Sequence, residues 1–191
     1  MRPVVLVHGI YDTVAIFRRM KPYLERHRFP VQAIPLIPND GRAPLDELAG
    51  QLDAQVRAAF GAGETIHLVG FSMGGLVSRY YVQRLGGIQR VGKFITIGTP
   101  HRGTRTAFLH SGMGARNMRP GSAFLQDLNR DVEMLERVSF ASIWTPLDLM
   151  ILPASSSRIE VGRSFPVRTL LHPLLVHDGR VLRLVLKILN E

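Results

Sequence analysis

Five residues near the middle of the chain have the types and the spacing of a nucleophile on a tight turn. The segment Gly70-Phe71-Ser72-Met73-Gly74 has the form G-x-S-x-G. Its two ends need glycine, because a side chain there would strike the adjoining strand or the start of the following helix. Such a turn holds the Ser72 hydroxyl at the positive end of that helix and leaves the Met73 amide free to donate to an oxyanion. The pattern therefore predicts a serine nucleophile.

The flanking segments decide whether this pentapeptide is more than a chance match. An apolar run at residues 66–69 predicts a strand directly before it. After it, apolar residues recur at helical spacing from Gly75 to Leu85, and Gly86-Gly87 ends the pattern. The serine thus lies between a predicted strand and a predicted helix, as the turn requires.

The rest of the chain alternates strands with helices. Apolar runs predict further strands at residues 3–7, 31–37, 94–97, 140–144 and 167–171, and helical spacing predicts helices at 13–27, 44–60 and 178–189. We expect Pro22 to disturb the first helix and the last helix, apolar nearly all round, to be buried. This order predicts an α/β fold, a doubly wound parallel sheet of about six strands with helices on both faces. The length of 191 residues predicts one domain, residues 1–191.

Composition narrows the classes of function. The net charge is +9, but the 24 basic residues are scattered and lack interleaved aromatic residues, so we expect a solvated basic surface and no nucleic-acid partner. A weak attraction to anionic lipid surfaces is a further expectation. The chain has no cysteine, which excludes disulfides and thiolate sites. No run approaches about 18 apolar residues, and the first apolar run is too short for a signal peptide, so a cytoplasmic location is expected.

Three segments in order resemble motifs of the α/β-hydrolase superfamily, and within it of the minimal bacterial lipases and esterases. They are Val4–Gly9, His67–Gly75 and Ile97–Thr104. Such hydrolases use an N–H from the loop after the first of these strands as the second oxyanion donor, and we assign it to Ile10.

The resemblance also implies a catalytic acid and a base in the last third of the chain. The family order of nucleophile, acid and histidine points to Asp148 and His172. His177 is the alternative base, but Pro173 favours an extended His172 at the end of the predicted strand, whereas His177 adjoins a helix start at Asp178. Ester hydrolysis through an acyl-enzyme on Ser72 follows, with no metal or cofactor.

Fewer features of the sequence indicate which residues bind the substrate. Residues 105–138 lack clean periodicity, and a cap over an apolar cleft and a plain surface excursion remain equal alternatives. The candidate substrate-binding side chains are Tyr11, Phe71, Phe108 and Met113, for an ester or lipid substrate. An acyltransferase or a thioesterase would use the same triad, and an inactive binding protein of this fold is a third alternative.

Overall fold

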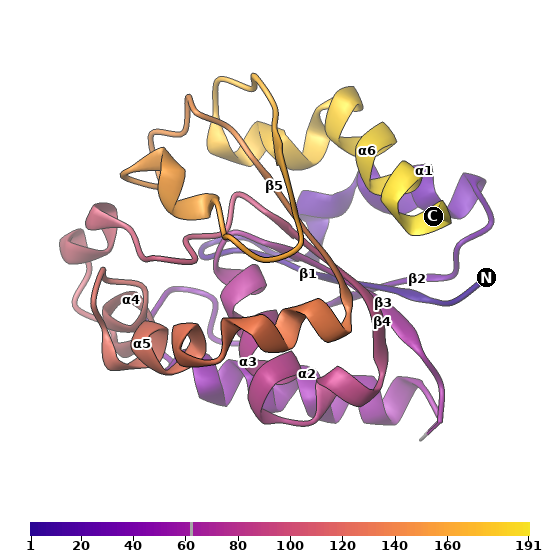
Figure 1. The fold of residues 1–191 in the computed structure, drawn as a ribbon, viewed down its shortest axis with the longest axis horizontal. Helices are drawn as coiled ribbons and strands as arrows, with labels where there is room; N and C mark the ends of the chain where they lie inside the picture. Colours follow the sequence, from indigo (N-terminus) through magenta and orange to yellow (C-terminus); the bar gives the residue numbers. More distant parts are fainter. Residues whose placement is uncertain (62) are drawn as a thin grey trace.

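The computed structural model describes residues 1–61 and 63–191 and contains one six-stranded parallel sheet. The strand order is β2-β1-β3-β4-β5-β6, and all neighbouring strands are parallel (Figure 1). The strands are β1 (Val4–Val7), β2 (Val31–Ile34), β3 (Ile66–Phe71), β4 (Val91–Ile97), β5 (Ser139–Trp144) and β6 (Arg163–Pro166). The chain starts at β1, moves outward to β2 and then crosses to β3, so the direction of winding reverses beside β1. The predicted fold class is confirmed.

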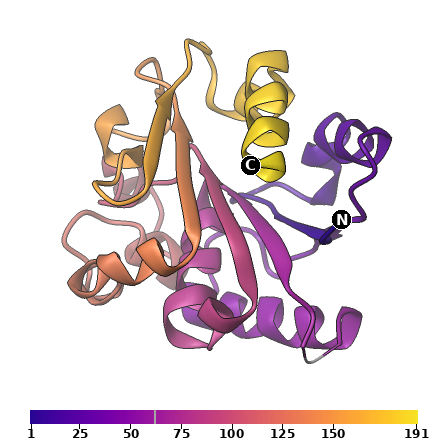
Figure 2. The same ribbon diagram turned by 45° about the vertical axis from the view of Figure 1, so that its right-hand side comes forward.

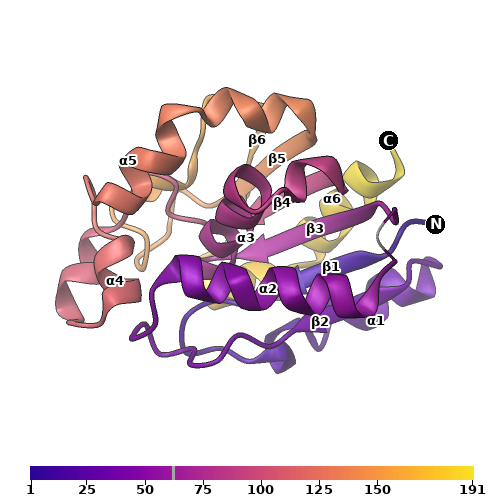
Figure 3. The same cartoon turned by 90° about the horizontal axis from the view of Figure 1, so that it is seen from below.

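Helices cover both faces of this sheet. The α-helices are α1 (Met20–Arg26), α2 (Leu45–Ala59), α3 (Met73–Arg84), α4 (Met113–Asn117), α5 (Ala123–Arg130) and α6 (Gly179–Asn190). The helices α1 and α6 lie side by side on one face (Figure 2), and α2 and α3 lie together on the other (Figure 3). Each face has its own apolar core, with Val5 and Val7 pointing to the α2–α3 side and Val4 and Leu6 to the α1–α6 side. Burial on both faces explains why β1 is a continuous apolar run and why the other central strands are rich in apolar residues.

The predicted sixth strand is wrong in position. β6 pairs residues 163–166 with β5, from Ala141↔Arg163 to Trp144↔Pro166. The apolar run at 167–171 lies beyond it, and Leu170 is 70% exposed. β6 is an edge strand with only partly covered side chains, so it carries no apolar run, and the edge tolerates a proline that lacks an N–H.

The predicted helix at 13–27 is two shorter elements. A 3₁₀-helix at Val14–Phe17 precedes α1. Pro22 lies in the first turn of α1, where no intrahelical N–H is needed, so the expected disturbance is absent there.

Two strand boundaries and the character of the last helix differ from the sequence prediction. β2 ends at Ile34, before a proline, and β4 begins earlier than expected. The last helix, α6, is amphipathic: Val181 and Val185 are buried, whereas Arg183 and Lys187 are exposed. The helix is buried against the sheet on one face, as expected, but the expectation that it is apolar nearly all round was wrong. No helix in the described part of the chain has the length and apolar character needed to cross a bilayer.

The stretch at 105–138 forms short helices. A 3₁₀-helix at Arg105–Leu109 leads into α4 and α5, and a further 3₁₀-helix at Val132–Arg137 precedes β5. A buried arginine on α3, Arg79, forms hydrogen bonds to this stretch. Arg79 is 0% exposed, and its guanidinium donates to the Leu128 carbonyl at 2.8 Å and to Asn129 Oδ1 at 3.1 Å. Burial lowers the pKa of Arg79 to about 9. The role of the stretch as a cap stays a prediction.

Candidate active site

Ser72 sits on a strained turn between β3 and α3. Its φ of +53° is rare for a residue with a side chain, and its N–H donates to the Ile97 carbonyl at 2.8 Å. A Cβ at Gly70 would lie 2.5 Å from the Gly75 Cα, and one at Gly74 would overlap the carbonyl oxygen of Val7. The two glycines of the pentapeptide therefore have the steric cause expected from the sequence.

Asp148 and His172 form a buried pair. His172 Nδ1 lies 2.7 Å from Asp148 Oδ2, with both side chains almost fully buried. The other oxygen, Asp148 Oδ1, accepts from the N–H groups of Met150 and Ile151 at 2.9 Å each, which fixes the carboxylate. Because a carboxylate only accepts, His172 carries its proton on Nδ1 and presents Nε2 as an acceptor. That Nε2 is buried and has no partner among the described residues.

The His172 ring is held next to the nucleophile turn from two sides. The Phe71 ring stacks on it with centroids 4.9 Å apart. Gly98, at φ +56°, leaves room on another side, since a Cβ there would lie 2.9 Å from His172 Cε1. Ser72 follows Phe71 directly, and its N–H donates to Ile97, the residue before Gly98. His172 therefore packs against residues next to Ser72 and next to the hydrogen-bond partner of Ser72. Phe71 is buried and packs against the imidazole. It was predicted to bind substrate, but it is not among the residues that line the pocket at Ser72.

Two backbone N–H groups, those of Ile10 and Met73, are available as hydrogen-bond donors near Ser72. Met73 is the first residue of α3, so its N–H has no intrahelical acceptor. The Ile10 N–H makes no hydrogen bond within the described part of the chain, and Ile10 lines one pocket with Ser72. The structure thus places the predicted donors, serine and histidine around the carboxyl ends of β1, β3 and β4.

A carboxyl group that sequence reasoning missed also lies here. Asp12 Oδ2 and Ser72 Cβ would each be 3.0 Å from a Cβ on Gly9, so both border Gly9. Burial raises the pKa of Asp12, while the nearby charges of His8 and His172 oppose that shift. No periodicity or spacing marks Asp12; only the fold brings it beside Ser72.

The pocket at Ser72 has a volume of about 210 Å³ and apolar walls. Ala107, Leu109 and Met118 from the 105–138 stretch line it, together with Leu149 and Met150 from the loop around Asp148. Ala107, Leu109 and Met118 lie in the stretch for which a cap over an apolar cleft was one of the two expectations, but none of these five residues was predicted individually to bind substrate.

Of the predicted substrate-binding residues, Tyr11 lines the pocket at Ser72, whereas Phe108 and Met113 do not. Tyr11 lines it, and its hydroxyl lies 3.2 Å from His110 Nδ1 on the opposite segment. Phe108 and Met113 are exposed and do not line it, and the Phe108 ring instead stacks against the Arg119 guanidinium at 4.9 Å. Their role in binding substrate stays a prediction, and the short helical turns give no periodicity from which to choose the side that faces the pocket.

His177, the alternative base, lies apart from this arrangement. It ends the 3₁₀-helix at His172–His177, and burial followed by the charges of Arg18 and Arg19 lowers the pKa of its imidazole. Asp178 caps α6 by accepting the Arg180 N–H at 2.8 Å. Within the described residues, no cluster of three or more His, Cys, Asp or Glu side chains could hold a metal ion.

Comparison with known proteins agrees with this geometry. Residues 3–145 match the family described as palmitoyl protein thioesterase. The chain belongs to this family. The matched part includes Ser72 and ends before Asp148 and His172.

Two curated relatives show what this family member is similar to. The lysosomal thioesterase PPT2 of Mus musculus is 33% identical over 107 residues, which is 53% of this chain and 35% of that protein. A triacylglycerol lipase of Pseudarthrobacter phenanthrenivorans is 36% identical over 114 residues, which is 55% of this chain and 35% of that protein. The match thus spans about a third of the length of these relatives.

Among solved structures, the mature Bacillus licheniformis lipase BlEst2 superimposes on this family member with a TM-score of 0.82. The match covers 98% of this chain and 91% of that one at 16% sequence identity. It supports the α/β-hydrolase fold for nearly the whole chain.

Proposed function

We propose that this protein is a serine hydrolase that cleaves carboxylic esters through an acyl-enzyme on Ser72. The observation that carries the proposal is the buried Asp148–His172 pair, which leaves the His172 Nε2 as an unpartnered acceptor among the described residues. An imidazole oriented by a carboxylate, next to a serine on a strained turn, is the arrangement that activates a hydroxyl nucleophile.

The reaction runs in two steps. His172 Nε2 takes the Ser72 proton while the serine oxygen attacks the ester carbonyl, and the N–H groups of Ile10 and Met73 hold the resulting oxyanion. Asp148 stabilises the imidazolium that forms. The imidazolium then protonates the leaving alcohol, and water releases the acyl group by the same route.

Thioester cleavage is the second candidate. The family description and the name of the mouse relative both refer to thioesterases. The same nucleophile and oxyanion donors serve a thioester carbonyl, and a thiolate leaves with less need of a proton. The narrow apolar pocket suits the acyl part of either substrate. An acyltransferase would share the acyl-enzyme and differ only in the acceptor.

The exposed side chains around the proposed site favour binding of the protein to a lipid surface. Exposed large apolar side chains concentrate at Tyr11 and at residues 108–113, 147–152 and 170–174. Of these, Tyr11, Leu109, Leu149 and Met150 line the pocket, and Leu171 precedes His172. Leu170 and Leu174 share a hollow with Arg168. Apolar side chains beside positive charge suit a surface of anionic lipid.

The experiment combines covalent labelling with a substrate series. A fluorophosphonate probe should label the wild type and leave Ser72→Ala unlabelled, and the chain has no cysteine that could react in its place. Turnover of acyl nitrophenyl esters and of the matched acyl thioesters, with and without an added alcohol, then separates esterase, thioesterase and acyltransferase. Absence of both labelling and turnover in folded wild type would instead support an inactive binding protein.

A further inference from the structure

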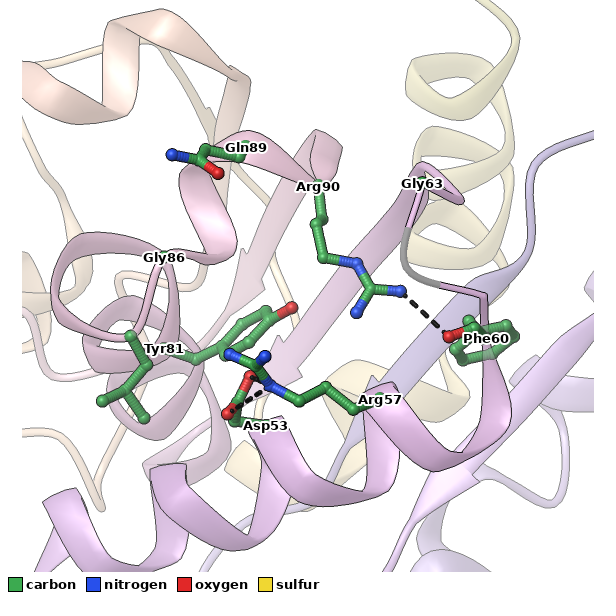
Figure 4. Close-up of a pocket in the computed structure, with 9 residues that line it drawn as sticks. Asp53, Arg57, Phe60, Gly63, Tyr81, Gly86, Gln89 and Arg90 are labelled. Atoms are coloured by element: carbon green, nitrogen blue, oxygen red, sulfur yellow. Dashed lines mark hydrogen bonds and ion pairs between the residues drawn. The ribbon is translucent and has the colours of Figure 1, made fainter.

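A second pocket lies at the end of β3 opposite to Ser72, and Figure 4 shows the residues that line it. Its volume is about 470 Å³, more than twice that of the pocket at Ser72. Arg90 borders it and accepts, through its carbonyl, the N–H of Ile66 at the start of β3, whereas Ser72 follows the end of that strand. The length of β3, roughly 20 Å, therefore separates the two sites.

The floor of this pocket contains a buried hydroxyl without an acceptor. Tyr81, on α3, is 0% exposed, and its hydroxyl has no hydrogen-bond partner among the described residues. The ring fits there because Gly87 lacks a side chain: a Cβ on Gly87 would lie 2.6 Å from Tyr81 Cε1. Burial raises the pKa of Tyr81, so the phenol keeps its proton at neutral pH and can donate it in a hydrogen bond.

The Arg90 guanidinium lies on the side toward which the Tyr81 hydroxyl points in Figure 4. Its Nη2 donates to the carbonyls of Phe60 and Gly61 at 3.3 and 2.9 Å, which fixes the group in place. Its Nε is buried and, within the described part of the chain, has no partner. Two buried donors therefore border one pocket without an acceptor among the described residues, so an acceptor bound there would be stabilised by hydrogen bonds.

A second arginine, Arg57, also lines this pocket. Arg57 is bonded to Asp53 with Nε 2.8 Å from Oδ2, and its side chain is 65% exposed. Together Arg57 and Arg90 outweigh the single carboxylate of Asp53, so the lining carries a net positive charge. Guanidinium groups have donors only and match the oxygens of a phosphate in pairs.

We propose that this pocket binds a phosphate monoester. The phosphate oxygens accept hydrogen bonds from Arg90, Arg57 and Tyr81, and the organic part lies against Phe60 and Leu85, which also line the pocket. The volume exceeds what a bare phosphate ion fills, and these apolar walls have no role in holding an ion alone. The site is separate from Ser72, so the inference does not depend on the proposed hydrolysis.

Titration calorimetry tests the proposal with three probes at equal ionic strength: adenosine 5′-monophosphate, inorganic phosphate and chloride. We expect the monoester to bind about tenfold or more tightly than inorganic phosphate, and chloride to give no saturable heat. Tyr81→Phe, which removes only the hydroxyl, should weaken monoester binding about tenfold, and Arg57→Gln about threefold.

Arg183→Gln is the matched control, because Arg183 is also exposed and lies on α6, on the opposite face of the sheet from α2 and α3. It should leave monoester binding unchanged, and thermal midpoints of all variants report whether each is folded. Equal binding of phosphate and monoester would overturn the assignment of an organic ligand. Binding that Tyr81→Phe and Arg57→Gln leave unaltered would overturn the site itself and would indicate that water occupies it.

Discussion

Gly98→Ala should disable the protein by displacing the base while leaving the triad chemically intact. The added Cβ would lie 2.9 Å from His172 Cε1 and 3.2 Å from its Nδ1. Carbon atoms in contact prefer about 3.5 to 4.0 Å, so the ring must move by roughly 0.6 Å or more. The Phe71 ring blocks one direction, and the 2.7 Å bond to Asp148 limits the others.

The magnitude follows from this displacement. A misplacement of about 1 Å in a catalytic group costs on the order of 100-fold, so we expect kcat/KM for a nitrophenyl ester to fall between about 10-fold and 100-fold. Alanine at φ +56° also costs about 1 kcal/mol in stability, equivalent to a fall in Tm of about 3 °C for a chain of this size.

Gly121→Ala provides the control. Gly121 has a similar φ of +76°, and a Cβ there would meet nothing within 4 Å. It should lower Tm by a similar amount and leave kcat/KM unchanged. Wild-type turnover in Gly98→Ala, at a Tm matching that of Gly121→Ala, would refute the role of His172 as the base.

Four further outcomes are expected. Asp148→Asn should lower kcat about 10⁴-fold, because the wrong imidazole tautomer would face Ser72, while a circular dichroism spectrum shows an unchanged fold. His177→Ala should stay within about twofold of wild-type kcat; a larger loss would reassign the base. Leu109→Asp should reduce kcat/KM about tenfold more for long acyl esters than for acetate, whereas Phe108→Asp should show no such chain-length effect. Burial, with nearby positive charge, lowers the pKa of His67 to about 4. Since the unfolded chain binds that proton from about pH 6.5, stability is full above pH 6.5 and falls towards pH 4, and denaturant titration of His67→Gln should show a shallower fall.

The centre of the fold could be predicted from the sequence because central parallel strands are buried on both faces. β1 is an unbroken apolar run, β3 is apolar apart from His67, and the glycines around Ser72 mark the turn by steric need. The edge of the sheet could not be placed in the same way. β6 is half covered, so its residues resemble a loop, and the more apolar run at 167–171 was mistaken for it.

The substrate pocket was the least predictable part. Its walls come from short helical turns and from the loop around Asp148, where inward and outward positions follow no fixed period. Leu109 and Phe108 are adjacent, yet only Leu109 lines the pocket. Asp12 shows the same limit, because its position beside Ser72 depends on the path of a loop and leaves no pattern in the sequence.

In this strand order, two of the three proposed catalytic residues follow the strands β5 and β6 at one edge of the sheet. Ser72 follows the central strand β3, whereas Asp148 follows β5 and His172 follows β6, the outermost strand. Edge elements open at lower free energy than central ones. During gradual denaturation, catalytic activity should therefore vanish before the helical signal of α2 and α3 declines. An ester assay would then report whether the last quarter of the chain is packed against the rest of the sheet. The helical signal of the whole chain does not resolve this step of folding.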